Sequence, residues 1–285
     1  MVQVKILRTT IARLVEYLSN GYPPWASYRV MMYCRDIGLD KCPGVRPIGI
    51  GDIFRRLCCK IVLLLTKGQA TKPCGIDQLC CGFEAGIEGA VHHIRGLWEN
   101  HADDEEPWGV LLIDARNAFN EGNRKQMVCT ARHLWPSGAR FLFNMYRRHA
   151  VLVMRGDNKG STVFLHSKEG ITQGCPLAML GYILLLLPLI RVLKKEFSGV
   201  DSPWYADDGA AAGKIPRILA FFNRLCELGP DFCYFPEESK SKSIVRGKDL
   251  ERVKIRLEKS ESKLTLTDGS RYLGGFIGDM EKQTK

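Results

Sequence analysis

Apolar side chains recur every three or four residues in several long stretches of the chain, which is the spacing of a helix with one buried face. The predicted helices lie at 3–18, 53–65, 83–99, 123–135 and 214–229. The longest apolar run, 176–190, is shorter than the ~20 residues that a membrane span needs. Since Pro188 also lies near the end of that run, we expect a buried core helix there.

Shorter apolar runs predict strands. The runs at 150–156 and 161–167 flank the turn sequence "DNKG", which predicts a hairpin. The run "WGVLLID" at 108–114 is apolar almost throughout, as in a strand buried on both faces. Extended structure is also expected at 44–52, 241–245 and 271–278. Helices mixed with antiparallel hairpins favour an α+β fold over a doubly wound sheet.

Acidic residues stand at the ends of two predicted strands. Asp114 ends the buried run, and Asp207 and Asp208 occupy a predicted turn between a strand at 205–206 and another that begins at Gly209. Carboxylates at the ends of buried strands are costly unless a cation compensates them, and magnesium binds such oxygen ligands together with phosphates. The sequence Asp-Asp-Gly is also ordinary turn chemistry, so both interpretations stay open.

The charge and cysteine content restrict the partners and the compartment. The 285 residues carry a formal net charge of +10, which favours nucleic acid first and a membrane surface second as an acidic partner, although a generic basic protein would show the same balance. Lys5, Arg8 and Arg13 interrupt any apolar leader, and the eleven cysteines form no C-x-x-C pair. We therefore expect an intracellular protein with reduced thiols, in the nucleus or the cytoplasm. The cysteines at 74, 80 and 81 with His92 and His93 could suggest zinc, but their spacing matches no standard finger.

Six segments follow one another in a recognisable order along most of the chain. They are "RPIGIGDIFRRLCCKIV", "LLIDARNAFN", "GITQGCPLAML", "YADD", "FPEESKSKSIV" and "RYLGGFIG". In this order they resemble the motifs of the reverse transcriptases of non-long-terminal-repeat retrotransposons. The four residues "YADD" alone recur by chance, whereas six motifs in the family's order are specific. The resemblance implies an α+β right-hand polymerase fold, with palm and fingers and an antiparallel palm sheet backed by helices.

The resemblance also assigns ranges to the parts of this fold. Residues 1–108 would form a fingers-like region leading into the palm, and 109–121 the palm strand with its acid. Residues 122–169 would return to the fingers, and 170–285 would form the palm with the catalytic hairpin and the primer-grip-like strands. We expect the thumb to be largely absent, because the chain ends just after "RYLGGFIG".

The implied activity is RNA-directed DNA synthesis on an RNA template and a DNA primer, from deoxynucleoside triphosphates. Asp114 and Asp207 would bind two magnesium ions, with Asp208 a third, more peripheral acid; manganese is an alternative metal. Two such ions would activate the primer 3′-hydroxyl and neutralise charge on the leaving pyrophosphate.

The resemblance also implies a nucleotide pocket. Gln173 and Gly174 would line it, although a loop that precedes a helix would look the same. Arg46 would contact the triphosphate, since guanidinium suits phosphate geometry, or would be a surface arginine. Lys240 would lie near the pyrophosphate, with Lys242 or a solvated charge run as alternatives.

Phe119 corresponds to the steric gate that disfavours a 2′-hydroxyl and so favours DNA synthesis; a core aromatic ring is the alternative. The chain departs from the family's pattern at Asn120, where many relatives carry an acid, and at Cys175, where relatives often carry Ser or Asp.

Three hypotheses follow: a reverse transcriptase core, a catalytically inactive or domesticated remnant that binds RNA or a partner protein, and an RNA-directed RNA polymerase. Phe119 favours the first over the third.

Overall fold

The computed structural model describes residues 2–41, 44–156 and 160–279. The chain divides into two compact units. The first comprises Met1–Pro73 and Phe119–Leu185, and the second comprises Cys74–Ala118 and Leu186–Lys285. The division into fingers and palm ranges stays a prediction.

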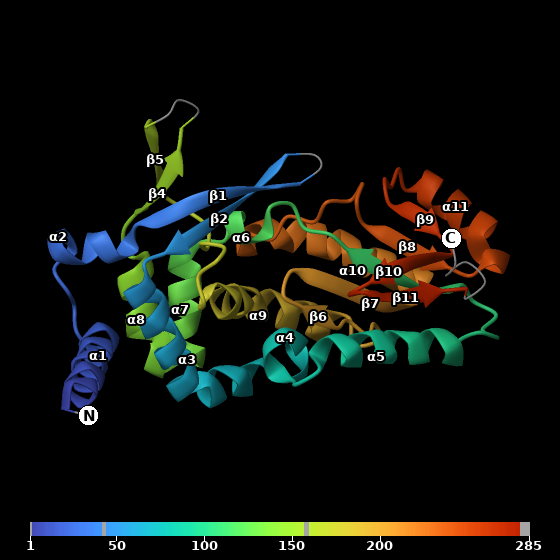
Figure 1. Cartoon of the computed structure of the whole chain (residues 1–285). Coiled ribbons are helices and arrows are strands. Elements are labelled where there is room, and N and C mark those ends of the chain that lie inside the picture. The colour runs from blue at the N-terminus through green and yellow to red at the C-terminus, as the bar shows by residue number, and fades with distance from the viewer. Residues whose placement is uncertain (1, 42–43, 157–159, 280–285) are drawn as a thin grey trace. The chain divides into compact units, whose positions relative to one another are not determined.

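The first unit contains a sheet and several helices (Figure 1). Its helices are α1 (Val2–Asn20), α2 (Trp25–Tyr28), the 3-10 turn η1 (Arg29–Met32), α3 (Ile53–Cys74), α6 (Ala118–Glu121), α7 (Arg124–Leu134), α8 (Pro136–Tyr146) and the first half of α9 (Ala178–Glu196). Its strands are β1 (Cys34–Asp40), β2 (Val45–Gly51), β4 (Ala150–Arg155) and β5 (Thr162–Ser167).

The sheet of the first unit has the strand order β2-β1-β4-β5. The predicted hairpin is confirmed as β4 and β5, in which Ala150 lies opposite Ser167; Asp157 to Lys159 of its predicted turn lie outside the described residues. Extended structure at 44–52 is confirmed as β2, which pairs with β1 along its whole length. Strand β1 was not predicted, because its sequence "CRDIGLD" shows no clean alternation.

Local sequence signals account for where α7 and α8 begin. The side chain of Asn123 accepts a hydrogen bond from the Gln126 N–H (3.0 Å), which satisfies one free donor of the first turn of α7. Pro136 occupies the start of α8, where its missing N–H costs nothing. Between the two helices, the fully buried Trp135 donates its indole N–H to Thr66 Oγ1 on α3 (2.9 Å).

The second unit contains the remaining elements. Its helices are η2 (Gly75–Asp77), α4 (Leu79–Gly82), α5 (Gly86–Asn100), the second half of α9, α10 (Ile215–Leu228), η3 (Gly229–Phe232), η4 (Gly247–Asp249) and α11 (Leu250–Lys259). Its strands are β3 (Trp108–Ile113), β6 (Trp204–Tyr205), β7 (Asp208–Lys214), β8 (Lys242–Val245), β9 (Thr265–Thr267), β10 (Gly269–Tyr272) and β11 (Gly275–Gly278).

Strand β3 is the middle strand of a five-stranded sheet with the order β6-β7-β3-β8-β9. It is antiparallel to both neighbours, and both faces are covered. On one face, Val110 packs with Ile94 and Trp98 of α5. On the other, a Cβ at Gly109 would lie 2.7 Å from Ile215 Cδ1 of α10. Burial on both faces explains the continuous apolar run. The α+β fold is confirmed, but its central sheet is mixed: β6 and β7, β7 and β3, and β3 and β8 pair antiparallel, whereas β8 and β9 pair in parallel.

Helix α9 is the predicted core helix. Its residues from Tyr182 to Leu187 are fully buried, as expected of a core helix. Within the described residues, no helix combines the length and the apolar character that crossing a bilayer would require.

Candidate functional site

Asp114 is the first residue after β3, and the backbone around it is held on both sides. Its N–H donates to Ser241 Oγ (3.2 Å), and its carbonyl accepts from the Glu237 N–H (2.8 Å). The Asp114 side chain is exposed. A carboxylate is thus presented to solvent from the end of the most buried strand in the unit.

The second acidic segment is the β6–β7 hairpin, and its turn differs by one residue from the prediction. Tyr205 pairs with Asp208, so the two turn residues are Ala206 and Asp207, and Asp208 already belongs to β7. The predicted strand at 205–206 and turn at Asp207 and Asp208 were therefore wrong by one position. A two-residue hairpin needs a positive φ at its first central residue, and Ala206 has φ 55°.

The register of β3 and β7 brings two acids together. Ile113 lies opposite Gly209 in the last pair of these strands, and the next residue outward on each side is Asp114 and Asp208, both of which line one cavity. Directly opposed residues have Cβ atoms about 4.5–5.5 Å apart, and like charges there repel. The pKa of Asp208 is accordingly raised to about 6, first by partial burial and then by Asp207 and Asp114.

The two opposed acids share a cavity of about 210 Å³ with two lysines. Asp114, Asp208, Lys240 and Lys242 all line it. Lys240 lies 3.7 Å from Glu237, and Lys242 donates to Ser270 Oγ (3.2 Å). Both lysines of the sequence prediction therefore line the same cavity as the acids.

The donor chemistry of this cavity suits a hard divalent cation that is shared with a substrate. Magnesium typically takes one or two carboxylates together with substrate phosphates. Within the described part of the chain, no group of three or more His, Cys, Asp or Glu side chains is placed to hold a metal by itself, and this includes the cysteines and histidines between 74 and 93. Phosphate oxygens would therefore have to complete any magnesium site at these acids. Asp208 lines the cavity with Asp114, whereas Asp207, which the resemblance makes the principal ligand of the hairpin, is the turn residue before it, so the ranking of the two stays a prediction.

The predicted nucleotide-binding residues other than Lys240 belong to the first unit, where three of them lie close together. The Gly49 N–H of β2 donates to the Gln173 carbonyl (2.8 Å), and Gln173 Nε2 donates to Asn120 Oδ1 (3.3 Å). Gly174 has φ 94°, and a Cβ there would lie 2.9 Å from the Gly49 carbonyl oxygen, so this position requires glycine.

Phe119 and Arg46 complete this set. The Phe119 ring is half-buried and stacks on Tyr182 with centroids 4.5 Å apart, while its carbonyl accepts from the Ile171 N–H (2.7 Å). Arg46 lies on β2, three residues before Gly49, with an exposed side chain. Phe119, Gln173 and Gly174 thus lie close together where β2 meets the loop before α9. Arg46 lies on β2.

Cys175, where the sequence departs from the resembling family, interacts electrostatically with a buried arginine that sequence reasoning missed. Arg55 of α3 is 1% exposed, and its Nη2 donates to Cys34 Sγ (3.1 Å). A hydrogen bond from Cys59 and the charge of Arg55 lower the pKa of Cys175. A buried cation favours the anionic form of a nearby thiol, which is the direction of the shift at Cys175.

Sequence reasoning also missed Gln78, which lies between η2 and α4 and is fully buried. Its Nε2 donates to the Ala206 carbonyl (2.8 Å), and its Oε1 accepts from the Ala206 N–H (3.0 Å). On the other side of the turn, the Tyr234 hydroxyl donates to the Asp207 carbonyl (3.1 Å). A lone glutamine has no periodic signal, so only the fold connects it to the acidic hairpin.

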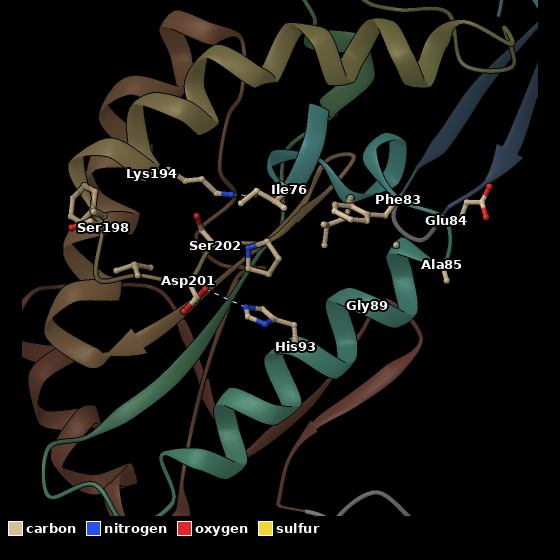
Figure 2. A pocket seen from close by; sticks show the side chains of 15 residues that line it. Ile76, Phe83, Glu84, Ala85, Gly89, His93, Lys194, Ser198, Asp201 and Ser202 are labelled. Carbon is tan, nitrogen blue, oxygen red and sulfur yellow. Dashed lines mark hydrogen bonds and ion pairs between the residues drawn. The ribbon is translucent and has the colours of Figure 1, made fainter. Parts of the chain in front are cut away.

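A larger cavity of about 640 Å³ lies elsewhere in the second unit (Figure 2). Ile76, Leu79 and Phe83 form apolar walls, and His93 Nε2 lies 3.2 Å from Asp201 Oδ1 at its edge. None of the predicted site residues lines it. The opposed acids, and not the greater volume, therefore identify the candidate active site.

Comparison with known proteins supports the fold class. No family model matches the chain, and no curated protein matches its sequence. The structure is similar to apo telomerase from Candida tropicalis, with a TM-score of 0.61 and 10% identity over 97% of this chain and 52% of that one. It is also similar to telomerase from Candida albicans in complex with a TWJ fragment of telomeric RNA, with a TM-score of 0.58 and 10% identity over 83% and 47% of the two chains. The chain thus has the right-hand fold of reverse transcriptase-like polymerases, and it spans about half the length of these structures.

Proposed function

We propose that this chain is the polymerase core of a reverse transcriptase from a non-long-terminal-repeat retrotransposon, which adds deoxynucleotides to a primer 3′-hydroxyl on an RNA template. The observation that carries the proposal is the placement of Asp114 and Asp208 in one cavity with Lys240 and Lys242. Six motifs in the family's order and a telomerase-like fold support it.

The acids of the palm sheet would form the catalytic centre. Asp114, Asp207 and Asp208 would hold magnesium, or manganese, together with the substrate phosphates. When bound, the metal would supply activation of the primer hydroxyl and neutralisation of the leaving pyrophosphate. Buried β3 and the β6–β7 hairpin keep the carboxylates in place despite their mutual repulsion.

Residues of the first unit would select and hold the nucleotide. Gly174, whose φ is positive, lets the backbone of the Gln173 loop approach a ligand closely. Phe119 would exclude a 2′-hydroxyl, and Arg46 would contact the triphosphate. The net charge of +10 suits a nucleic acid partner, and the Candida albicans telomerase structure contains RNA.

Primer extension on an RNA template tests the proposal. Purified chain is given deoxynucleotides with magnesium or manganese, beside an Asp207→Asn/Asp208→Asn control. Extension that disappears in the control supports the polymerase. Extension with ribonucleotides but not deoxynucleotides would instead indicate an RNA-directed RNA polymerase. A folded chain that binds primer–template without extending it would indicate a remnant that only binds nucleic acid, and would refute the proposal.

A further inference from the structure

The turn that carries Asp207 adopts a backbone conformation that its own sequence does not favour. Ala206 has φ 55°, in the left-handed region that residues with a Cβ avoid. Glycine and asparagine are the usual residues there. Some interaction from outside the hairpin must therefore hold Ala206 in this conformation.

Gln78 provides that interaction. Its side-chain amide makes two hydrogen bonds with the same residue, to the carbonyl of Ala206 (2.8 Å) and from its N–H (3.0 Å). Both residues are buried: Gln78 is 0% exposed and Ala206 is 3% exposed. A buried polar group left without a partner is costly, so the pair holds Ala206 and Gln78 together.

The backbone of Gln78 is itself held firmly. Its N–H donates to the Cys74 carbonyl (3.2 Å), and its carbonyl accepts from the Cys81 N–H (3.3 Å). The side-chain amide of Gln78 therefore projects from a fixed backbone position between η2 and α4.

The conformation of Ala206 decides where the acids lie. Asp207 is the next residue, and Asp208 begins β7 opposite Tyr205. If Ala206 relaxed to a negative φ, the two-residue turn could not form, and Asp208 would lose its place beside Asp114.

We propose that Gln78 is a positioning residue for the acidic hairpin: it holds Ala206 in the left-handed conformation and so keeps Asp207 and Asp208 aligned with Asp114. The catalytic consequence rests on the polymerase function proposed above. The structural consequence does not depend on it.

The experiment compares Gln78→Met with a matched control, Asn144→Leu. Asn144 is another fully buried amide, in the first unit, and its Nδ2 donates to the carbonyls of Leu18 (2.9 Å) and Gly21 (3.0 Å). Each variant replaces a buried amide by an apolar side chain of similar length. Hydrogen exchange by mass spectrometry is measured on the full chain, with the peptide that covers residues 204–209 as the readout.

We expect Gln78→Met to accelerate exchange across residues 204–209 by about tenfold or more, and Asn144→Leu to leave this peptide unchanged. In the Gln78→Met background, Ala206→Gly should restore most of the protection at 204, 205, 208 and 209, because glycine adopts a positive φ freely. A side chain that merely fills space would not be rescued in this way. If Gln78→Met fails to fold, Gln78→Glu is measured in its place. This substitution keeps the side-chain length and the acceptor for the Ala206 N–H, so it should cause a smaller loss of protection.

In primer extension, Gln78→Met should lower kcat by about 100-fold, as expected for misplaced catalytic groups. The KM for primer–template should change little, and Ala206→Gly should recover part of kcat. Unchanged exchange at 204–209 in the folded Gln78 variants, or no rescue by Ala206→Gly, would overturn the proposal. If the wild-type chain extends no primer, the polymerase function fails, and hydrogen exchange alone still decides the role of Gln78.

Discussion

The opposed acids make a quantitative prediction about stability. Asp208→Asn removes a charge that faces Asp114 and Asp207, and we expect it to stabilise the metal-free protein at pH 7. The pKa of Asp208 rises from 3.8 to about 6 on folding. At 1.36 kcal/mol for each pKa unit, this shift corresponds to an upper limit of about 3 kcal/mol. Because Asp208 is only partly buried and still reaches solvent, screening reduces the expected gain to about 1 kcal/mol.

The sign of the pH dependence follows from the raised pKa. Between pH 3.8 and about 6, the folded state binds a proton at Asp208 more tightly than the unfolded state does. As the pH falls from 7, protonation of Asp208 therefore increases the free energy of unfolding of the wild type. This increase is complete below about pH 3.8. The advantage of Asp208→Asn should accordingly be largest at pH 7 and should shrink towards zero near pH 4.

Denaturant unfolding in the presence of a chelator, followed by tryptophan fluorescence at pH 7 and pH 4.5, measures this difference. Asp103→Asn is the matched control, because Asp103 is an exposed acid in the loop between α5 and β3. It should change stability by less than about 0.5 kcal/mol at either pH. If Asp208→Asn is less stable than the wild type at pH 7, or if its effect does not depend on pH, the acids do not repel one another as argued.

Three further predictions concern other parts of the molecule. Above pH 9, where the Cys175 thiol is ionised, Cys175→Ala should destabilise the protein by about 3 kcal/mol in denaturant unfolding, since it removes the negative charge that interacts with buried Arg55. Cys129→Ala at an exposed position should be nearly neutral, and equal effects of the two substitutions would contradict the interaction. Because folding lowers the pKa of Cys175, its contribution should be present above the ordinary thiol value of 9.0 and be lost as the pH falls through the lowered value. Gly174→Ala should lower the free energy of unfolding by about 1–3 kcal/mol, because φ is 94° and the new Cβ would lie 2.9 Å from the Gly49 carbonyl oxygen. A neutral result would show that this loop can shift. Magnesium should raise the midpoint of thermal unfolding of the wild type and a chelator should reverse the rise, whereas no shift at millimolar magnesium would exclude binding to the free protein.

Much of the secondary structure could be predicted because its causes are local. The apolar run that became β3 and the buried stretch of α9 have patterns that depend on which side chains meet water. Helix α11 was missed, because "LERVKIRLEK" contains more charged residues than apolar ones. The positions of Asp114, Asp207 and Asp208 next to strand ends were also visible, because an acid that ends an apolar run is a local feature.

Tertiary structure decided how these acids meet. The approach of Asp114 to Asp208 depends on the register of two strands that are far apart in the sequence, and a register is set by packing and turn geometry together. The turn lies one residue earlier than predicted, because Gln78, 128 residues before Ala206, stabilises a conformation that alanine alone avoids. The burial of Arg55 beside Cys175 is equally invisible in a sequence where arginine is normally exposed. Residue types and local patterns indicated which residues could do chemistry. Long-range contacts set where these residues lie, because hydrogen bonds and charge pairs between distant segments leave no local pattern.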